Sequence, residues 1–302
     1  MTDETQIKYL ERADYLIEIN RWREAIVEIT KHLSSFPDDY YALCQMAFCR
    51  YELNELKPAL EFTKKAIAAE PELEWAYRLQ SLIFGASGNN SKALELAEIC
   101  VEKAPYFIAS LQTLAYAQIN KFLLDDANNT TDIMLEIAPE ANETHDACGY
   151  LAMKNENWAA AKKHFKLSLQ IESLSYFTLN NLGNVYFHRS KIGWNFPKRT
   201  ALQRQAVECF AQSVKINPTF KLAQENLKIA KETGVVSTLP ISKILINLLR
   251  CVLFLGISFY AMYAYFQYFG VTSVSWVIFV GGYLFLILGI LSFINYRRNK
   301  NL

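Results

Sequence analysis

Small and apolar side chains recur along the first 232 residues with a period of 34 residues, and polar positions lie between them. A period of about 20–50 residues indicates a chain of stacked structural repeats. Three series share this spacing and are in phase with one another. They are Ala13, Ala47, Ser81, Ala115, Gly149 and Gly183; Ala25, Ala59, Ala93, Ala127 and Ala161; and Pro37, Pro71, Pro105 and Pro139.

Each repeat is expected to be a pair of antiparallel helices. Asn20, Asn54 and Gly88 lie midway through the first three repeats, where a turn between helices favours residues that tolerate positive φ. One pair cannot bury its apolar face alone, so six stacked pairs are predicted to share one continuous core. An amphipathic stretch, 219–232, is predicted to cap the last pair. The predicted units are 6–39, 40–73, 74–107, 108–141, 142–175 and 176–218.

The sixth unit departs from this period. Ala206 and Pro218 come 11 residues later than expected, which indicates an insertion within residues 190–205. A basic aromatic loop there could rest on anionic lipid headgroups, and a solvated loop without function is the alternative. The residues predicted to contact the membrane surface are Lys191, Trp194, Lys198 and Arg199.

The sixth unit also contains the stretch LNNLGNVY, with Leu179, Leu182, Gly183 and Tyr186. With this stretch and the 34-residue period, residues 6–232 resemble the tetratricopeptide repeat (TPR) family. The resemblance implies an all-α solenoid of about six helix pairs plus a capping helix. It also implies that the first helix of each pair faces a concave groove that holds peptides or partner helices.

Projecting the period onto that inner face predicts a groove rich in aromatic side chains. Large aromatic residues anchor binding partners, and asparagine can both donate to and accept from a peptide backbone. The alternative for any one ring is that it packs only against neighbouring repeats. The predicted groove residues are Tyr41, Phe48, Tyr51, Trp75, Arg78, Tyr116, Tyr150, Phe177, Asn181 and Asn184.

A long apolar stretch follows the repeats and a linker at 233–250. Residues 251–294 are 44 positions without a charged side chain, in two apolar runs at 251–269 and 274–294. A helix needs about 20 apolar residues to cross a bilayer, so the two runs are predicted to form a hairpin through the lipid bilayer. A buried hydrophobic hairpin of the soluble domain is the alternative.

Basic residues flank this hairpin at both ends, including the tail at 295–302. By the positive-inside rule, the flanking charges predict a two-pass membrane protein with both termini in the cytosol. The N-terminal stretch also lacks the pattern of a secretory signal peptide. A bacterial inner membrane is expected rather than a eukaryotic organelle membrane. The flanking residues are Lys243 and Arg250 before the hairpin, and Arg297, Arg298 and Lys300 after it.

Composition and motifs argue against several function classes. Residues 1–240 carry 26 basic and 30 acidic side chains, and a net charge of −4 does not suit a nucleic-acid binder. His145 and Cys148 share a helix face, but the further ligands that zinc requires do not accompany them. The sequence contains no GxxxxGK[ST], GxGxxG or HExxH motif. We therefore expect no metal, no cofactor and no catalytic activity.

These features predict a membrane-anchored scaffold that recruits a protein or peptide partner, from the cytosol or the membrane, through the aromatic groove. The alternative is a non-catalytic assembly or regulatory subunit of a membrane enzyme, transporter or secretion complex. In that case the hairpin at 251–294 makes the specific contact. The sequence does not identify the partner.

Overall fold

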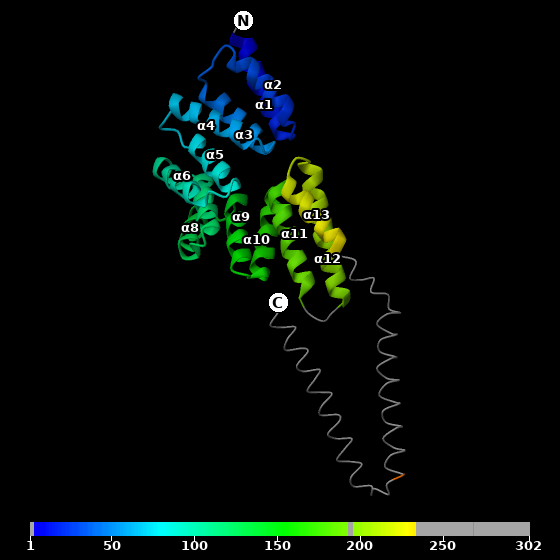
Figure 1. The fold of residues 1–302 in the computed structure, drawn as a ribbon. Coiled ribbons are helices and arrows are strands. Elements are labelled where there is room, and N and C mark those ends of the chain that lie inside the picture. The colour runs from blue at the N-terminus through cyan, green and yellow to red at the C-terminus, as the bar shows by residue number, and fades with distance from the viewer. Residues whose placement is uncertain (1–2, 193–195, 234–267, 269–302) are drawn as a thin grey trace. The chain divides into compact units, whose positions relative to one another are not determined.

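The computed structural model describes residues 3–192 and 196–233, together with Tyr268 (Figure 1). Contacts divide the chain into two units, Met1–Val235 and Val236–Leu302, and the described helices named below all lie in the first. Within this described part, no helix combines the length and the hydropathy needed to cross a membrane. The two predicted spans, 251–269 and 274–294, lie outside the described residues except for Tyr268.

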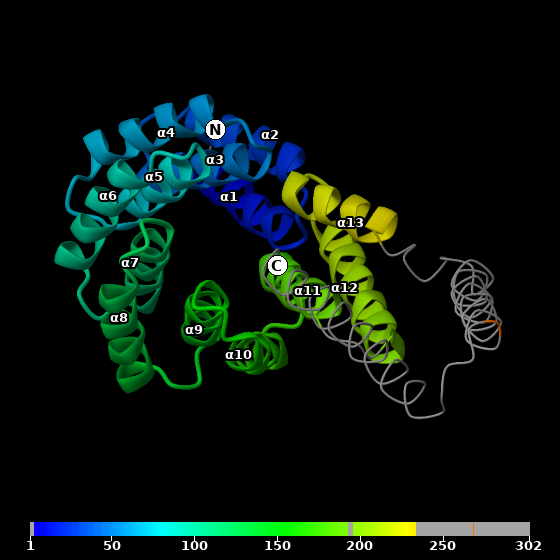
Figure 2. The ribbon, with the colours of Figure 1, turned by 60° about the horizontal axis from the view of Figure 1, so that its bottom comes forward.

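The described part of the first unit forms thirteen helices and no strand, as an all-α solenoid. Six consecutive pairs stack along a curved path that runs from blue to yellow-green, and α13 follows the last pair (Figure 2). The pairs are α1 (Asp3–Glu18) with α2 (Trp22–Leu33), α3 (Tyr40–Glu52) with α4 (Leu56–Ala69), α5 (Trp75–Ala86) with α6 (Asn90–Lys103), α7 (Ile108–Asn120) with α8 (Leu124–Ile137), α9 (Asn142–Lys154) with α10 (Trp158–Ile171), and α11 (Tyr176–Lys191) with α12 (Phe196–Ile216), followed by α13 (Lys221–Thr233).

The small residues of the 34-residue period lie where the two helices of each pair approach closely. Every member of the first two series is buried. In the fifth pair a Cβ atom added at Gly149 would lie 2.7 Å from the Phe165 ring. At Gly183 the added atom would lie 2.6 Å from the ring of Phe210. Because real Cβ atoms essentially never approach other atoms so closely, a larger residue at either position would have to displace the phenylalanine ring.

The turns within the pairs also follow the period. Asn20, Asn54 and Gly88 adopt positive φ, as their residue types predict. Phe122 and Glu156 occupy the same repeat position and adopt φ of 60° and 57°, although neither residue type favours that region. The stacked helices therefore impose the left-handed turn in the fourth and fifth pairs.

The insertion in the sixth unit differs from the loop predicted for residues 190–205. Residues 196–205 are helical and form the start of α12, which has 21 residues in all. Pro197 lies in the first turn of this helix, where its missing N–H carries no cost. The added turns are joined to α11 by a hydrogen bond from Arg199 Nε to the Ser190 carbonyl oxygen at 2.6 Å.

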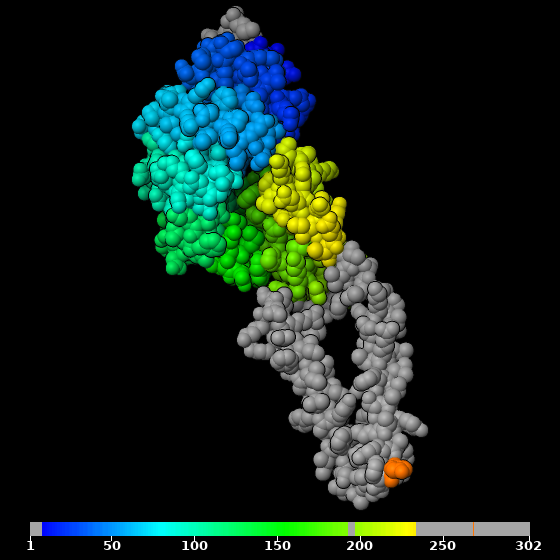
Figure 3. Space-filling view, viewed as in Figure 1, coloured from blue at the N-terminus to red at the C-terminus, as the bar shows by residue number. Residues whose placement is uncertain are grey.

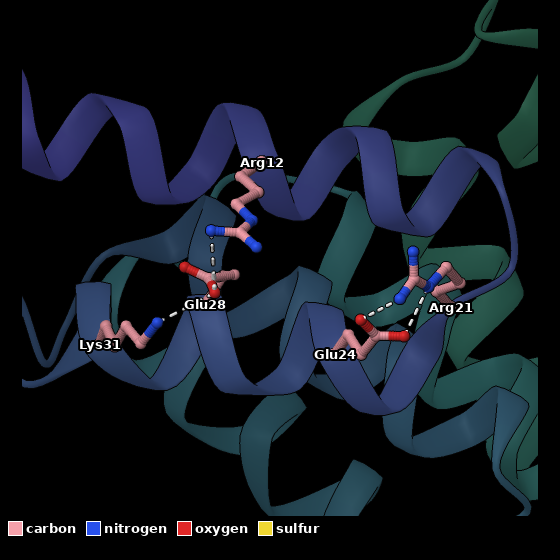
Figure 4. A network of polar contacts seen from close by, with 5 residues as sticks. All are labelled: Arg12, Arg21, Glu24, Glu28 and Lys31. Atoms are coloured by element: carbon pink, nitrogen blue, oxygen red, sulfur yellow. Dashed lines mark hydrogen bonds and ion pairs between the residues drawn. The ribbon is translucent and has the colours of Figure 1, made fainter.

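Ion pairs on α1 and α2 border the first pair's core (Figure 4). Glu28 of α2 is buried and lies between Lys31, at 2.9 Å, and Arg12 of α1, at 3.8 Å. Arg21 and Glu24 form a second pair at the start of α2. Glu28 thus places a carboxylate at the α1–α2 boundary with basic side chains from both helices around it.

The glycine contacts predict the effect of adding one methyl group. Gly183→Ala should lower the free energy of unfolding by about 1–3 kcal/mol, since the new Cβ atom must displace the Phe210 ring. Gly85→Ala is the matched control, because the nearest atom to its added Cβ is 4.0 Å away. That change should leave stability equal or raise it by up to about 1 kcal/mol, through the better helix propensity of alanine. Chemical denaturation of both variants checks this, and equal effects would contradict it.

Candidate functional site

The superhelix completes a turn, so that the second pair meets the sixth (Figure 2). The Tyr176 hydroxyl, at the start of α11, donates to both carboxylate oxygens of Glu52, at 2.7 and 2.8 Å. Asn217, just after α12, donates to Glu52 Oε2 at 2.9 Å, and the Thr219 hydroxyl donates to the Glu52 carbonyl oxygen at 3.0 Å. We call these four residues the closing contact. It joins residues up to 167 positions apart in the sequence.

Glu52 is buried in the closing contact, with 8% of its surface exposed. Burial raises the pKa of Glu52 to about 7, while the hydrogen bonds from Tyr176 and Asn217 act in the opposite direction. Both donors are neutral, so they compensate only part of the cost of burying a negative charge. The closing contact is therefore sensitive to pH near neutrality.

The closing contact forms one wall of a cavity of about 420 Å³ inside the superhelical turn, which we call the chamber. In the space-filling view the yellow segment containing α13 borders the blue and cyan helices on this side (Figure 3). The chamber is lined mainly from α3, α5, α7, α9, α11 and the start of α13, with one residue each from α4 and α6. Its volume falls within the range of about 300–1,000 Å³ that is usual for ligand pockets.

Four of the predicted groove residues line the chamber, namely Tyr51, Tyr116, Tyr150 and Phe177. The ring of Tyr116 lies 5.3 Å from that of Tyr150, nearly perpendicular to it, and 5.8 Å from that of Phe177. Phe220 continues the row, with ring distances of 6.5 Å to Phe177 and 5.1 Å to Tyr176. These rings form a continuous aromatic lining, from the fourth pair to the closing contact.

Polar contacts hold the tyrosines of the lining in place. The Tyr116 hydroxyl donates to Asp146 Oδ2 at 2.7 Å, and the Thr178 hydroxyl donates to Asp146 Oδ1 at 2.8 Å. Burial raises the pKa of Asp146 to about 6. The Tyr150 hydroxyl donates to Asn120 Oδ1 at 2.8 Å. Because the hydroxyls are engaged with neighbouring repeats, the rings themselves are the surfaces that a ligand in the chamber would contact.

A second group of predicted residues lies outside the chamber. The rings of Tyr41 and Trp75 lie 5.3 Å apart, and the Tyr41 hydroxyl donates to Asp14 at 2.8 Å. Arg78 lies 3.7 Å from Glu74 and over the ring of Phe107. Trp75 therefore does not line the chamber, whereas Tyr116 does.

The remaining groove residues differ in their surroundings. Phe48 packs against the cores of the first two pairs, 5.6 Å from the Trp22 ring and perpendicular to it. Asn181 is buried on α11, and its Nδ2 atom has no hydrogen-bond partner in the described part of the chain. Asn184 is half-buried one turn further along α11. Phe48 thus contributes to the core, whereas Asn181 retains an unused donor.

The residues predicted to contact lipid are spread over two helices. Lys191 ends α11, with its ammonium group 4.0 Å from the centre of the Phe187 ring. Lys198 and Arg199 lie in the first turn of α12, and Trp194 lies outside the described residues. Their contact with a membrane surface stays a prediction.

The histidine and cysteine residues singled out from the sequence do not form a metal centre. His145 packs beside His164 of α10, with ring centres 5.6 Å apart. Burial lowers the pKa of both histidines. Over residues 3–192 and 196–233, no three His, Cys, Asp or Glu side chains are arranged to hold a metal ion.

Sequence reasoning missed the residues of the closing contact. Glu52 ends α3, and the equivalent positions of the other units hold Glu18, Ala86, Asn120, Lys154 and His188. Such a mixed, mostly polar series is typical of an exposed helix end, so the repeat pattern carries no signal of burial. Only the curvature of the whole superhelix brings Glu52 to Tyr176 and Asn217.

Comparison with known proteins supports the fold. The sequence matches no protein-family model and no curated protein. The crystal structure of the APC/C hetero-tetramer Cut9–Hcn1 is similar with a TM-score of 0.55 and 19% identity, over 74% of this chain and 42% of that one. TTC0263, a thermophilic TPR protein from Thermus thermophilus, is similar with a TM-score of 0.54 and 17% identity, over 60% of this chain and 98% of that one. The solenoid is TPR-like.

The closing contact predicts a pH dependence of stability. The pKa of Glu52 is raised from an ordinary 4.5 to about 7, so the folded chain holds this proton more tightly than the unfolded chain. The resulting stabilisation is complete below pH 4.5 and is lost as the pH rises through 7. A shift of this size corresponds to roughly 3 kcal/mol in the free energy of unfolding.

Chemical denaturation between pH 4.5 and 8 measures this effect as the difference between the wild-type chain and Glu52→Gln, which cancels the titration of Asp146, His145 and His164. The wild-type chain should lose stability relative to the variant over that range. Glu18→Gln, the exposed equivalent in the first unit, should follow the wild-type profile. Parallel profiles for wild type and Glu52→Gln would show that the pKa of Glu52 is not raised in the folded chain.

Proposed function

We propose that this chain is a non-catalytic protein-interaction scaffold that binds a segment of a partner protein in the chamber. The observation that carries the proposal is the convergence of four predicted groove aromatics on one cavity of about 420 Å³. Concave, mostly apolar cavities with a few placed polar groups are the usual form of a ligand site. The TPR-like fold alone would not assign this function, because one fold supports many functions.

The lining suits a peptide side chain better than a flat protein surface. Tyr116, Tyr150 and Phe177 come from three neighbouring repeats, and their rings contact one another across the chamber wall, where Tyr51 also lies. Pre-positioned rings lose little conformational freedom on binding, so more of the contact energy appears as affinity. Tyr41 and Trp75 lie elsewhere on the first helices and would extend the contact beyond the chamber.

Filling the chamber tests this proposal without removing any core contact. Ala86 lines the chamber at the end of α5, yet its own side chain is exposed. Peptides selected from a displayed random library on the wild-type chain should bind Ala86→Phe about thirtyfold more weakly, the equivalent of losing one hot-spot contact of about 2 kcal/mol. Ser87→Phe is the matched control, since Ser87 is exposed and does not line the chamber. Equal loss in both variants, or no loss in either, would refute chamber binding.

We also propose that the scaffold is held at a membrane, with both termini in the cytosol. The support comes from the sequence, namely the 44 uncharged residues at 251–294 and the basic residues on either side. Anchoring would raise the effective concentration of the scaffold for membrane-bound partners. The alternative, a subunit that contacts a membrane complex through the hairpin, rests on the same residues.

Membrane extraction separates an anchored chain from one that merely associates. The 302-residue chain should stay with the membrane fraction after an alkaline carbonate wash and be released by detergent, since burial of two apolar helices holds it there. A chain ending at residue 234 should be released without detergent. Release of the 302-residue chain by carbonate would contradict the anchor.

Replacing residues 251–294 with an unrelated hairpin should preserve partner recruitment if the segment is only an anchor, and abolish it if the segment makes the specific contact.

A further inference from the structure

The chamber wall contains a buried carboxylate for which the described residues supply no cationic partner. The hydrogen-bond donors to the Glu52 side chain, Tyr176 and Asn217, are both neutral. Arg50, on the same helix, pairs instead with Glu55 at 2.5 Å. Lys221 also lines the chamber, but it is exposed, and no ion pair joins it to Glu52 within the described part of the chain.

The aromatic rings beside this carboxylate also favour a positively charged ligand. Tyr51 precedes Glu52 on α3, and the Tyr176 ring, which also lines the chamber, lies 5.1 Å from that of Phe220. Phe177 follows at 6.5 Å from Phe220. Aromatic faces attract cations through their quadrupole, and the attraction is stronger where water is excluded. A negative charge and several ring faces therefore border the same cavity.

These two observations favour one ligand chemistry. We propose that the chamber binds an organic cation, the guanidinium or alkylammonium group of a basic side chain on the partner segment, with Glu52 as its counter-charge and the aromatic lining around its apolar stem. That the cation belongs to a segment of a partner protein rests on the proposed function above. The preference of the chamber for a cation can be tested separately. Arginine and lysine fit such a site because their stems are apolar and only the tip is charged.

Binding of a cation should depend on pH through Glu52. The titratable groups that interact with it are Cys49 and Tyr51 on α3 and Tyr176 on α11, and Lys221 on α13 lines the same chamber. Burial raises the pKa of Cys49 to about 12 and raises that of both tyrosines, so these groups stay neutral near pH 7. A bound cation favours the ionised form of Glu52 and lowers its pKa, so affinity for the cation should increase as the pH rises through 7.

The experiment compares two peptides that differ in charge and hardly in shape. Both are acetylated, amidated pentapeptides with phenylalanines flanking the central residue, which is arginine in one and the neutral isostere citrulline in the other. Titration calorimetry on the 302-residue chain at pH 7.5 should show at least about tenfold tighter binding of the arginine peptide, the scale of a desolvated cation–π contact. Glu52→Gln, whose single amide oxygen can still accept from both Tyr176 and Asn217 at the position of Oε2, should abolish the difference. Glu18→Gln should preserve it, and Lys221→Gln should enlarge it by removing a repelling charge.

The wild-type chain provides a test that does not depend on a variant folding correctly. Lowering the pH from 8 to 6 should weaken binding of the arginine peptide and leave the affinity of the citrulline peptide unchanged. Equal affinities of the two peptides, persistence of the arginine preference in Glu52→Gln, or no binding of either peptide at millimolar concentration would overturn the inference. If N-acetylarginine amide binds as tightly as the arginine peptide, the chamber does not recognise a peptide segment, and the claim that the cation belongs to a partner protein is wrong.

The outcomes also separate this inference from the proposed function. If both peptides bind equally and Ala86→Phe weakens both, the chamber binds peptides and the assignment of a cation is wrong. If Ala86→Phe leaves both peptides bound, binding occurs outside the chamber and the proposed function itself is wrong.

Discussion

The structure depends on how closely the two helices of each pair can approach. That distance is set by a small residue on the first helix and by the residue that faces it from the second. In the fifth and sixth pairs a glycine faces a phenylalanine ring, whereas the first pair places Ala13 and Ile29 at the equivalent positions of one core cluster. In these three pairs a small residue faces a large one, whereas the third pair has two small residues, Ser81 and Ala97, at the equivalent positions.

The closing contact changes what kind of repeat protein this is. In a linear solenoid each repeat contacts only its neighbours, and stability is approximately a sum of local terms. Here Glu52 of the second pair accepts hydrogen bonds from two residues of the sixth pair. Tyr176 is the first residue of α11, and Asn217 directly follows α12. The shape of the chamber therefore depends on every pair between α3 and α11, since a small change of curvature in any of them moves one wall relative to the other.

The sequence predicted the features that repeat, because a period is visible wherever several units satisfy the same packing requirement. The helix pairs, the buried small residues and the turns at Asn20, Asn54 and Gly88 were of this kind. Phe122 and Glu156 occupy the same turn position, but the fold imposes their conformation, so their residue types gave no signal. Residues 196–205, which belong to the predicted insertion, lengthen α12, because helix-compatible residues after Pro197 continue the helix.

The candidate site could be predicted only in part, because only some of its residues follow the 34-residue period. Tyr116 and Tyr150 lie 34 residues apart and line the chamber together, as the period predicts. Phe48 lies on the corresponding helix of the second unit but packs into the core, because Trp22 of the first pair lies against it. Tyr176, Asn217 and Phe220 come from the irregular end of the solenoid. Their meeting with Glu52 is a property of the accumulated curvature, which no single repeat encodes.

Joining the second pair to the sixth also fixes how many repeats lie between them. Ordinary solenoids gain or lose whole repeats during evolution with little harm, because a new unit meets the same neighbours as the old. Deleting one unit between α3 and α11 would shorten the arc and carry Tyr176 and Asn217 away from a carboxylate that is then buried without its donors. Duplicating a unit there would separate them in the opposite direction. A pair added before α3 would instead extend the stack beyond the closed turn and leave the length of the joined segment unchanged.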